Sequence, residues 1–89
     1  MKVIVKLLLA LEQLMDNNKM EVEVSDGTTI MELIEHLEQK NPSTGIREAI
    51  LDRQGRLKVA LMVNKKTAKL EQKLSAGDEV VFFEIVAGG

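Results

Sequence analysis

The sequence predicts an α+β fold in which helices cover one face of a β-sheet. Segments of alternating apolar and polar residues, typical of half-buried strands, lie near both ends of the chain. Between them lies a segment with the apolar spacing of an amphipathic helix and a clear start signal. The expected order is therefore strand, strand, helix, short helix, strand, strand, in a single domain that spans residues 1–89.

The first expected strand, residues 1–8, opens the chain. Its alternation places three apolar side chains on the buried face: Val3, Val5 and Leu7. Ile4 and Leu8 lie on the opposite face, where lysines flank Ile4. This second face is therefore expected to contact water although it carries two apolar residues.

The second expected strand, residues 20–24, alternates Met and Val with Glu. It follows one or two helical turns at residues 10–15 and a turn-prone stretch at residues 16–18. Two alternating strands joined by a short connection predict an antiparallel pair at the start of the sheet.

The main helix has the best start signal in the chain. Thr29 is the expected N-cap and Glu32 stands three positions later, which together form a capping box. An apolar stripe that should lie across the sheet follows at helical spacing: Ile30, Leu33, Ile34 and Leu37. Pro42 ends this helix, because the residue before a proline is pushed out of the α conformation.

The second half of the chain is expected to complete the sheet. It begins with a short helix at residues 45–51 and a polar turn at residues 52–56. A strand at residues 57–63 follows, and a turn at residues 76–78 leads into the final strand at residues 79–86.

The composition excludes several classes of protein. With 45% hydrophobic and 29% charged residues, the chain is typical of a globular domain. No run of ~18 apolar residues is present, so no membrane contact is expected. The absence of cysteine excludes disulfides, thiol nucleophiles and Cys-ligated metals. A net charge of −2, without Trp or Tyr, gives no footprint for nucleic acid.

Two further features favour a metal-free, cytoplasmic protein. His36 is the single histidine; alone it is a poor metal ligand, and it is expected to be solvated on the polar half of the main helix. The start of the chain alternates like a strand and lacks the small-residue cleavage site of a signal peptide. We therefore expect no metal site and a cytoplasmic location.

The chain ends in a hydrophobic segment followed by Gly88 and Gly89. Without Cβ atoms, these residues can enter a channel too narrow for any side chain. From Val86 the chain can extend about 13 Å, enough to carry the α-carboxylate of Gly89 into a partner's active site. A frayed terminus is the alternative. Two glycines after so apolar a segment favour the interpretation in which this carboxylate is the reagent.

Taken together, these residues resemble the MoaD/ThiS family of ubiquitin-like sulfur carriers, over essentially the whole chain. The resemblance depends most on residues 74–83, Leu-Ser-Ala-Gly-Asp-Glu-Val-Val-Phe-Phe, which lead to the terminal Val-Ala-Gly-Gly. It implies the β-grasp fold, a mixed sheet of four to five strands with a main helix packed across one face. Residues 86–89 are then a flexible tail. The chain is closer to the MoaD branch, the small subunit of molybdopterin synthase, although Glu84 and Ile85 replace two prolines common there.

The resemblance implies a carrier rather than an enzyme. An activating enzyme of the ubiquitin-activating type uses ATP to adenylate Gly89, with Gly88 threaded into its active site, and the terminus becomes a thiocarboxylate. The sulfur then passes to the large subunit of molybdopterin synthase or to another acceptor. The chain has no P-loop, and no bound cofactor is expected. A ubiquitin-like protein modifier and a carrier for tRNA thiolation remain as alternatives that use the same terminus.

Docking of such partners needs an apolar surface near the tail. By analogy with the register of ubiquitin relative to its terminal glycines, Phe82 is expected in the core and Phe83 on the surface. The expected partner-binding residues are Phe83, Ile4, Leu8 and Ile85. A covering loop or a homodimer contact over these residues is the alternative.

Overall fold

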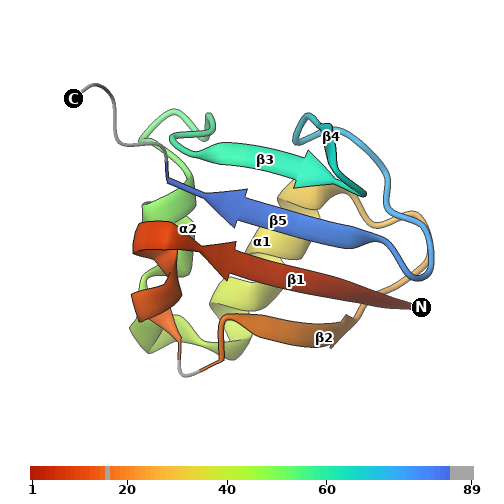
Figure 1. Ribbon diagram of the computed structural model, residues 1–89, viewed down its shortest axis with the longest axis horizontal. Helices are drawn as coiled ribbons and strands as arrows, with labels where there is room; N and C mark the ends of the chain where they lie inside the picture. The colour runs from red at the N-terminus through yellow and green to blue at the C-terminus, as the bar shows by residue number, and fades with distance from the viewer. Residues whose placement is uncertain (16, 85–89) are drawn as a thin grey trace.

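The computed structural model describes residues 1–15 and 17–84 (Figure 1). One sheet contains five strands in the order β2-β1-β5-β3-β4. The strands are β1 (Lys2–Leu8), β2 (Lys19–Glu23), β3 (Ala60–Val63), β4 (Lys66–Thr67) and β5 (Glu79–Phe83). The helices are α1 (Ile30–Lys40) and α2 (Ile46–Ile50), with short 3-10 segments η1 (Leu9–Leu14) and η2 (Pro42–Thr44).

The sheet is mixed, as the resemblance implied. β1 is antiparallel to β2 and parallel to β5, while β3 is antiparallel to both β5 and β4. The last strand therefore lies in the middle of the sheet, between β1 and β3. Because β1 and β5 are parallel, the end of β1 and the end of β5 lie at the same edge of the molecule (Figure 1).

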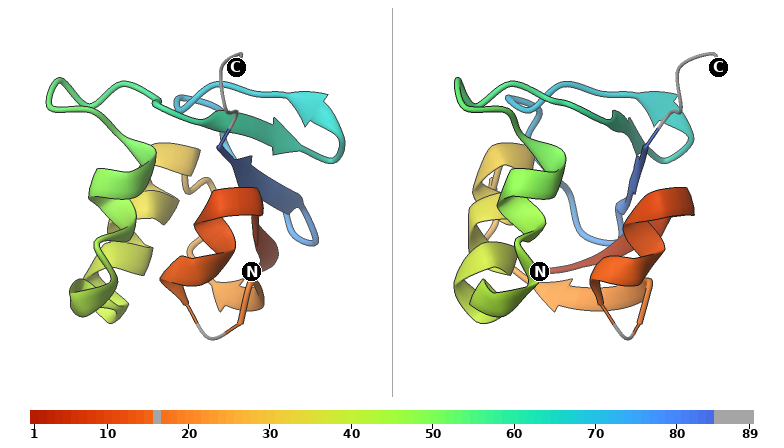
Figure 2. Two further views of the ribbon diagram at one scale, coloured as in Figure 1. Left: turned by 60° about the vertical axis from the view of Figure 1, so that its left-hand side comes forward. Right: turned by 90° about the vertical axis from the view of Figure 1, so that its left-hand side faces the viewer.

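The core lies between the sheet and the two helices, which pack together on one side of it (Figure 2). Inward-facing residues of β1 and β5 alternate with outward-facing ones, and the predicted inward set of β1 is fully buried. The helical stripe is buried as predicted, with at most 2% of any of its residues exposed: Ile30, Leu33, Ile34 and Leu37. Among the residues described, no helix is both long and apolar enough to span a bilayer.

The predicted capping box starts α1. The Thr29 backbone N–H donates to Glu32 Oε1 at 2.9 Å, and the Glu32 backbone N–H donates to Thr29 Oγ1 at 3.2 Å. These bonds satisfy backbone donors that the first helical turn leaves free. The bond from the Thr29 backbone, followed by the one from its hydroxyl, lowers the pKa of the Glu32 carboxyl, because both favour its charged form.

Three strand predictions were wrong in detail. The strand expected at residues 57–63 begins only at Ala60, because the backbone before it pairs with the end of α2: Leu57 bridges to Leu51, and the Lys58 N–H donates to the Ile50 carbonyl at 2.8 Å. The two-residue strand β4 was not predicted. The final strand, expected to include Glu84, ends at Phe83, and residues 85 and 86 lie outside the described residues.

Candidate functional site

The described chain stops just short of the proposed reagent. Glu84 is the last described residue, and its side chain is exposed. Ile85, Gly88 and Gly89, together with the expected flexible tail at residues 86–89, lie outside the described residues. The candidate site is therefore built from β5, which carries the chain end, and from the surfaces around its last residue.

The turn before β5 is held against the start of β1. Gly77 takes φ +83°, a conformation that residues with a Cβ adopt at a cost, and its N–H donates to the Lys2 carbonyl at 2.8 Å. The Ile4 N–H in turn donates to the Asp78 carbonyl at 2.8 Å. These two bonds fix the register between β1 and the strand that leads to the chain end.

Side chains fix the same turn to β3. The Asp78 carboxylate accepts from the Ser75 N–H at 2.8 Å and from Asn64 Nδ2 at 2.9 Å. Asn64 Oδ1 accepts from the Glu79 N–H at 3.0 Å. The Ser-Ala-Gly-Asp-Glu run on which the family resemblance depended is thus the structural device that anchors the start of β5.

The other end of β5 is open. Both flanking strands make their last pairing at Phe83: β1 through Leu8 and β3 through Ala60. Leu9 then takes φ +57°, and the chain turns into η1 instead of continuing beside β5. Glu84, the last described residue, follows the final pairing of β5 with both neighbouring strands, in the middle of the sheet (Figure 1).

The sheet face opposite the helices is apolar around this exit. Alternation along the three central strands brings to this face, named here the exposed sheet face, the residues Ile4, Leu8, Ala60, Met62, Val81 and Phe83. Leu8, Phe83 and Ala60 form one cross-strand row, and Val81 pairs with Met62 in the next row. Adjacent rows of apolar side chains give a continuous surface beside the chain end.

The structure brings the predicted partner-binding residues onto one face, with a correction to their exposure. Leu8 and Phe83 are direct partners in the sheet, whereas Ile4 pairs with Glu79 farther from the exit. Phe83 was expected to be exposed but is half-buried, because Leu8 and Ala60 flank it on both sides. Whether these residues bind a partner remains a prediction, and Ile85 lies outside the described residues.

Sequence reasoning missed three members of the exposed sheet face, although a signal for each of them was present. Val81 and Met62 occupy outward positions of strands whose alternation was recognised. Ala60 also takes an outward position in the strand expected at residues 57–63, but its place beside Phe83 depends on the register between β3 and β5.

Charged groups cross and border the exposed sheet face. Lys6 Nζ lies 3.3 Å from Glu79 Oε2, and each side chain is 30% exposed. The neighbouring edge strand β2 presents only charged side chains on this face: Lys19, Glu21 and Glu23. An apolar centre with a polar border is the usual composition of a protein–protein interface.

A shallow groove adjoins the exit on the helix side. Its lining includes Glu84, the last described residue, and Lys58, and its floor is apolar: Ala10, Leu11, Leu14, Ala49 and Val59. The end of β5 therefore has the exposed sheet face on one side and this groove on the other.

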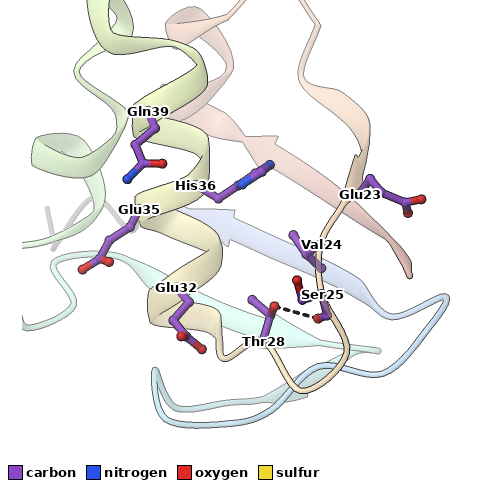
Figure 3. Close-up of a pocket in the computed structure, with 8 residues that line it drawn as sticks. All are labelled: Glu23, Val24, Ser25, Thr28, Glu32, Glu35, His36 and Gln39. Atoms are coloured by element: carbon purple, nitrogen blue, oxygen red, sulfur yellow. Dashed lines mark hydrogen bonds between the residues drawn. The ribbon is translucent and has the colours of Figure 1, made fainter.

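A second pocket lies between α1 and the segment that follows β2 (Figure 3). Its lining is rich in carboxylates, and His36 projects from α1 toward that segment. The expectation of a solvated His36 holds only in part: the residue is half-buried, and its Nε2 is enclosed and makes no hydrogen bond with the described residues. Within the described part of the chain, no three His, Cys, Asp or Glu side chains are placed to hold a metal.

Comparison with known sequences identifies relatives along nearly the whole chain. A profile of the ThiS family matches residues 5–89, a match that includes the terminal glycines. The molybdopterin synthase sulfur carrier subunit of Mycobacterium tuberculosis is 39% identical over 69 residues, which cover 78% of this chain and 74% of that protein.

Solved structures show the same fold. The small archaeal modifier protein SAMP1 of Haloferax volcanii has a TM-score of 0.84 at 23% identity, with 99% of both chains covered. A chain from the complex of subunits 1 and 2 of molybdopterin-converting factor from Helicobacter pylori has a TM-score of 0.59 at 20% identity, with both chains covered completely. These likenesses confirm the predicted ubiquitin-like β-grasp architecture.

Proposed function

The chain belongs to the ThiS family, and on this premise we propose that it is a sulfur carrier whose reagent is the carboxylate of Gly89. The observation that carries the proposal is the family match over residues 5–89, which runs through Gly88 and Gly89. The placement of β5 supports it, because this central strand delivers the chain end past both of its neighbours.

The pathway we propose is molybdopterin synthesis. The support is the relative from Mycobacterium tuberculosis, which is the sulfur carrier subunit of molybdopterin synthase and is 39% identical. That protein is a carrier subunit, and this chain is likewise a carrier rather than an enzyme. Catalysis and the binding of ATP then belong to partner proteins.

The chemistry begins with activation of the carboxylate, which is otherwise a poor electrophile. An oxygen of Gly89 attacks the α-phosphorus of ATP in the activating enzyme, pyrophosphate leaves, and an acyl-adenylate forms. A sulfide equivalent attacks the acyl carbon, AMP leaves with the bonding electrons, and one proton is released. The product is a thiocarboxylate, whose nucleophilic sulfur is transferred to the acceptor in a later step.

The exposed sheet face is the proposed docking surface for both partners. Phe83 and Leu8 lie in the row next to the exit, so a protein that takes Gly89 into its active site must pass close to them. Ile4 lies farther away, directly beside Glu79 of the Lys6–Glu79 ion pair, and contributes at the border. The complex of subunits 1 and 2 of molybdopterin-converting factor from Helicobacter pylori supports a second subunit as the acceptor.

The proposal is tested by the release of pyrophosphate from ATP. The protein is incubated with ATP and an activating enzyme of the ubiquitin-activating type, and then again as a variant extended by one residue after Gly89. We expect release with the wild-type chain and none with the extended chain, because the added residue displaces the reacting carboxylate. A protease-removable extension is the matched control, since trimming it back to Gly89 restores the reaction.

Two results would contradict the proposal. Equal pyrophosphate release from the extended chain would show that Gly89 is not the reacting group. Formation of an amide bond between Gly89 and lysines of other proteins, without thiocarboxylate, would assign the chain to the ubiquitin-like modifiers instead.

A further inference from the structure

Leu9 has an unfavourable backbone conformation and an apolar side chain that is exposed to water. It takes φ +57°, a left-handed conformation that is costly for a residue with a branched apolar side chain. Its side chain is 62% exposed, and within the described residues no other large hydrophobic residue is classed as exposed. Neither feature stabilises the fold. A strained residue that gains no burial suggests a functional role.

The position of Leu9 is at the chain exit. It directly follows Leu8, whose sheet partner is Phe83, the last paired residue of β5. It directly precedes Ala10, which lines the groove on the helix side of the exit. Leu9 therefore joins the exposed sheet face to the groove, next to the end of β5.

The left-handed conformation of Leu9 also determines where β1 ends. By turning the chain into η1, it ends β1 in the same row in which β5 makes its last pairing. The conformation that ends β1 beside Phe83 is thus the one that presents the Leu9 side chain to solvent there.

We propose that Leu9 is an anchor residue for the sulfur-accepting subunit and enters an apolar pocket of that protein when Gly89 is delivered. This inference rests on the proposed function. It commits to the acceptor because a protein of the same fold, from Helicobacter pylori, forms a complex with a second subunit, and because Leu9 is continuous with the exposed sheet face. An exposed apolar side chain contributes most to binding when it fills a well-packed pocket of the partner that excludes water.

The test compares two substitutions that relieve the same backbone strain. Leu9→Gly and Lys65→Gly each place glycine at a positive φ, +57° at Leu9 and +70° at Lys65. Lys65 is exposed in the turn between β3 and β4, at the opposite end of the sheet from the exit. Both variants should keep or gain thermal stability. Leu9→Gly should weaken binding to the acceptor subunit by about tenfold or more, whereas Lys65→Gly should not change it.

Two additional variants separate the side chain from the backbone. Leu9→Asn tolerates the left-handed conformation and removes the apolar surface, so it should bind as weakly as Leu9→Gly. Leu9→Met keeps an apolar side chain of similar volume and should retain most of the affinity. Affinity is measured by titration calorimetry with the acceptor subunit, and thiocarboxylate formation by the activating enzyme is measured in parallel.

The outcomes distinguish this inference from the proposed function. A wild-type chain that neither forms thiocarboxylate nor binds the acceptor overturns both. If the wild-type chain does both, and Leu9→Gly and Leu9→Asn bind the acceptor as tightly as wild type, the anchor role alone is overturned. If the Leu9 variants lose thiocarboxylate formation but keep their affinity for the acceptor, Leu9 is assigned to the activating enzyme instead. Self-association that Leu9→Asn abolishes, with acceptor binding unchanged, assigns it to a second copy of this chain.

Discussion

Phe82 and Phe83 are identical neighbours on one strand, yet they lie in opposite environments. Phe82 is fully buried in the core beneath the helices, and Phe83 is half-buried on the exposed sheet face beside the chain exit. Because strand side chains alternate, one step along β5 separates a core residue from the residue that we propose contacts partners. On this proposal, one face of the sheet serves stability and the other serves recognition.

The largest expected effect is on the buried face. Phe82→Ala should lower the free energy of unfolding by about 3–5 kcal/mol, because it removes a large side chain from a closely packed core. In a domain of this size such a loss is a large part of the total stability. Urea unfolding followed by circular dichroism measures it. A loss smaller than that of Phe83→Ala would contradict the assignment of Phe82 to the core.

The next effect is on recognition. Phe83→Ala should weaken binding of the acceptor subunit by about 2 kcal/mol, as expected of a central aromatic contact. Its cost in unfolding free energy should be clearly smaller than that of Phe82→Ala, because Phe83 is only half-buried. Calorimetric titration with the acceptor and urea unfolding of the same preparations give both numbers. Unchanged affinity, together with a loss of unfolding free energy as large as that of Phe82→Ala, would show that Phe83 serves the fold.

A smaller effect, on stability alone, is expected from the helix that covers the buried face. Thr29→Ala removes the N-cap hydroxyl of α1 and should cost about 1 kcal/mol of unfolding free energy. Affinity for the acceptor should not change, because α1 lies on the side of the sheet away from the exposed sheet face. A variant that lost affinity without losing stability would contradict the division between the two faces.

The smallest effect is a pH dependence in the same capping box. The pKa of the Glu32 carboxyl is lowered in the folded protein. Its contribution to stability is therefore present above its pKa in the unfolded chain, 4.5, and is lost as the pH falls through its lower pKa in the folded protein. Glu32→Gln should therefore be less stable than wild type at neutral pH, and the difference should shrink toward about pH 3. Urea titrations across this range test it; a difference that grew on acidification would have the wrong sign.

The sequence was a good guide wherever a local pattern determines the outcome. Alternation in residues 1–8 predicted the buried side chains of β1, and Thr29 with Glu32 predicted the start of α1. Alternation also put Phe82 and Phe83 on opposite faces of the sheet, and the analogy with the register of ubiquitin put Phe82 inside. In each case the signal lies within a few residues and does not depend on distant partners.

Features that depend on distant partners could not be predicted in this way. Residues 57–59 alternate like a strand, but their backbone pairs with the end of α2, and this contact leaves no pattern in the sequence. β4 is too short for periodicity to appear. The left-handed Leu9 gives no signal either, because leucine is typical of neither turns nor positive φ. The part of the site that joins the exposed sheet face to the groove therefore emerged only from the structure.

The central claim, that the Gly89 carboxyl carries the sulfur, is tested most directly by intact mass spectrometry. The protein is reacted with ATP, sulfide and the activating enzyme, and fragmentation locates any sulfur along the chain. The account predicts one oxygen replaced by sulfur, confined to the C-terminal residue. Sulfur found elsewhere, or a terminus that stays an ordinary carboxylate while the acceptor still receives sulfur, would contradict it.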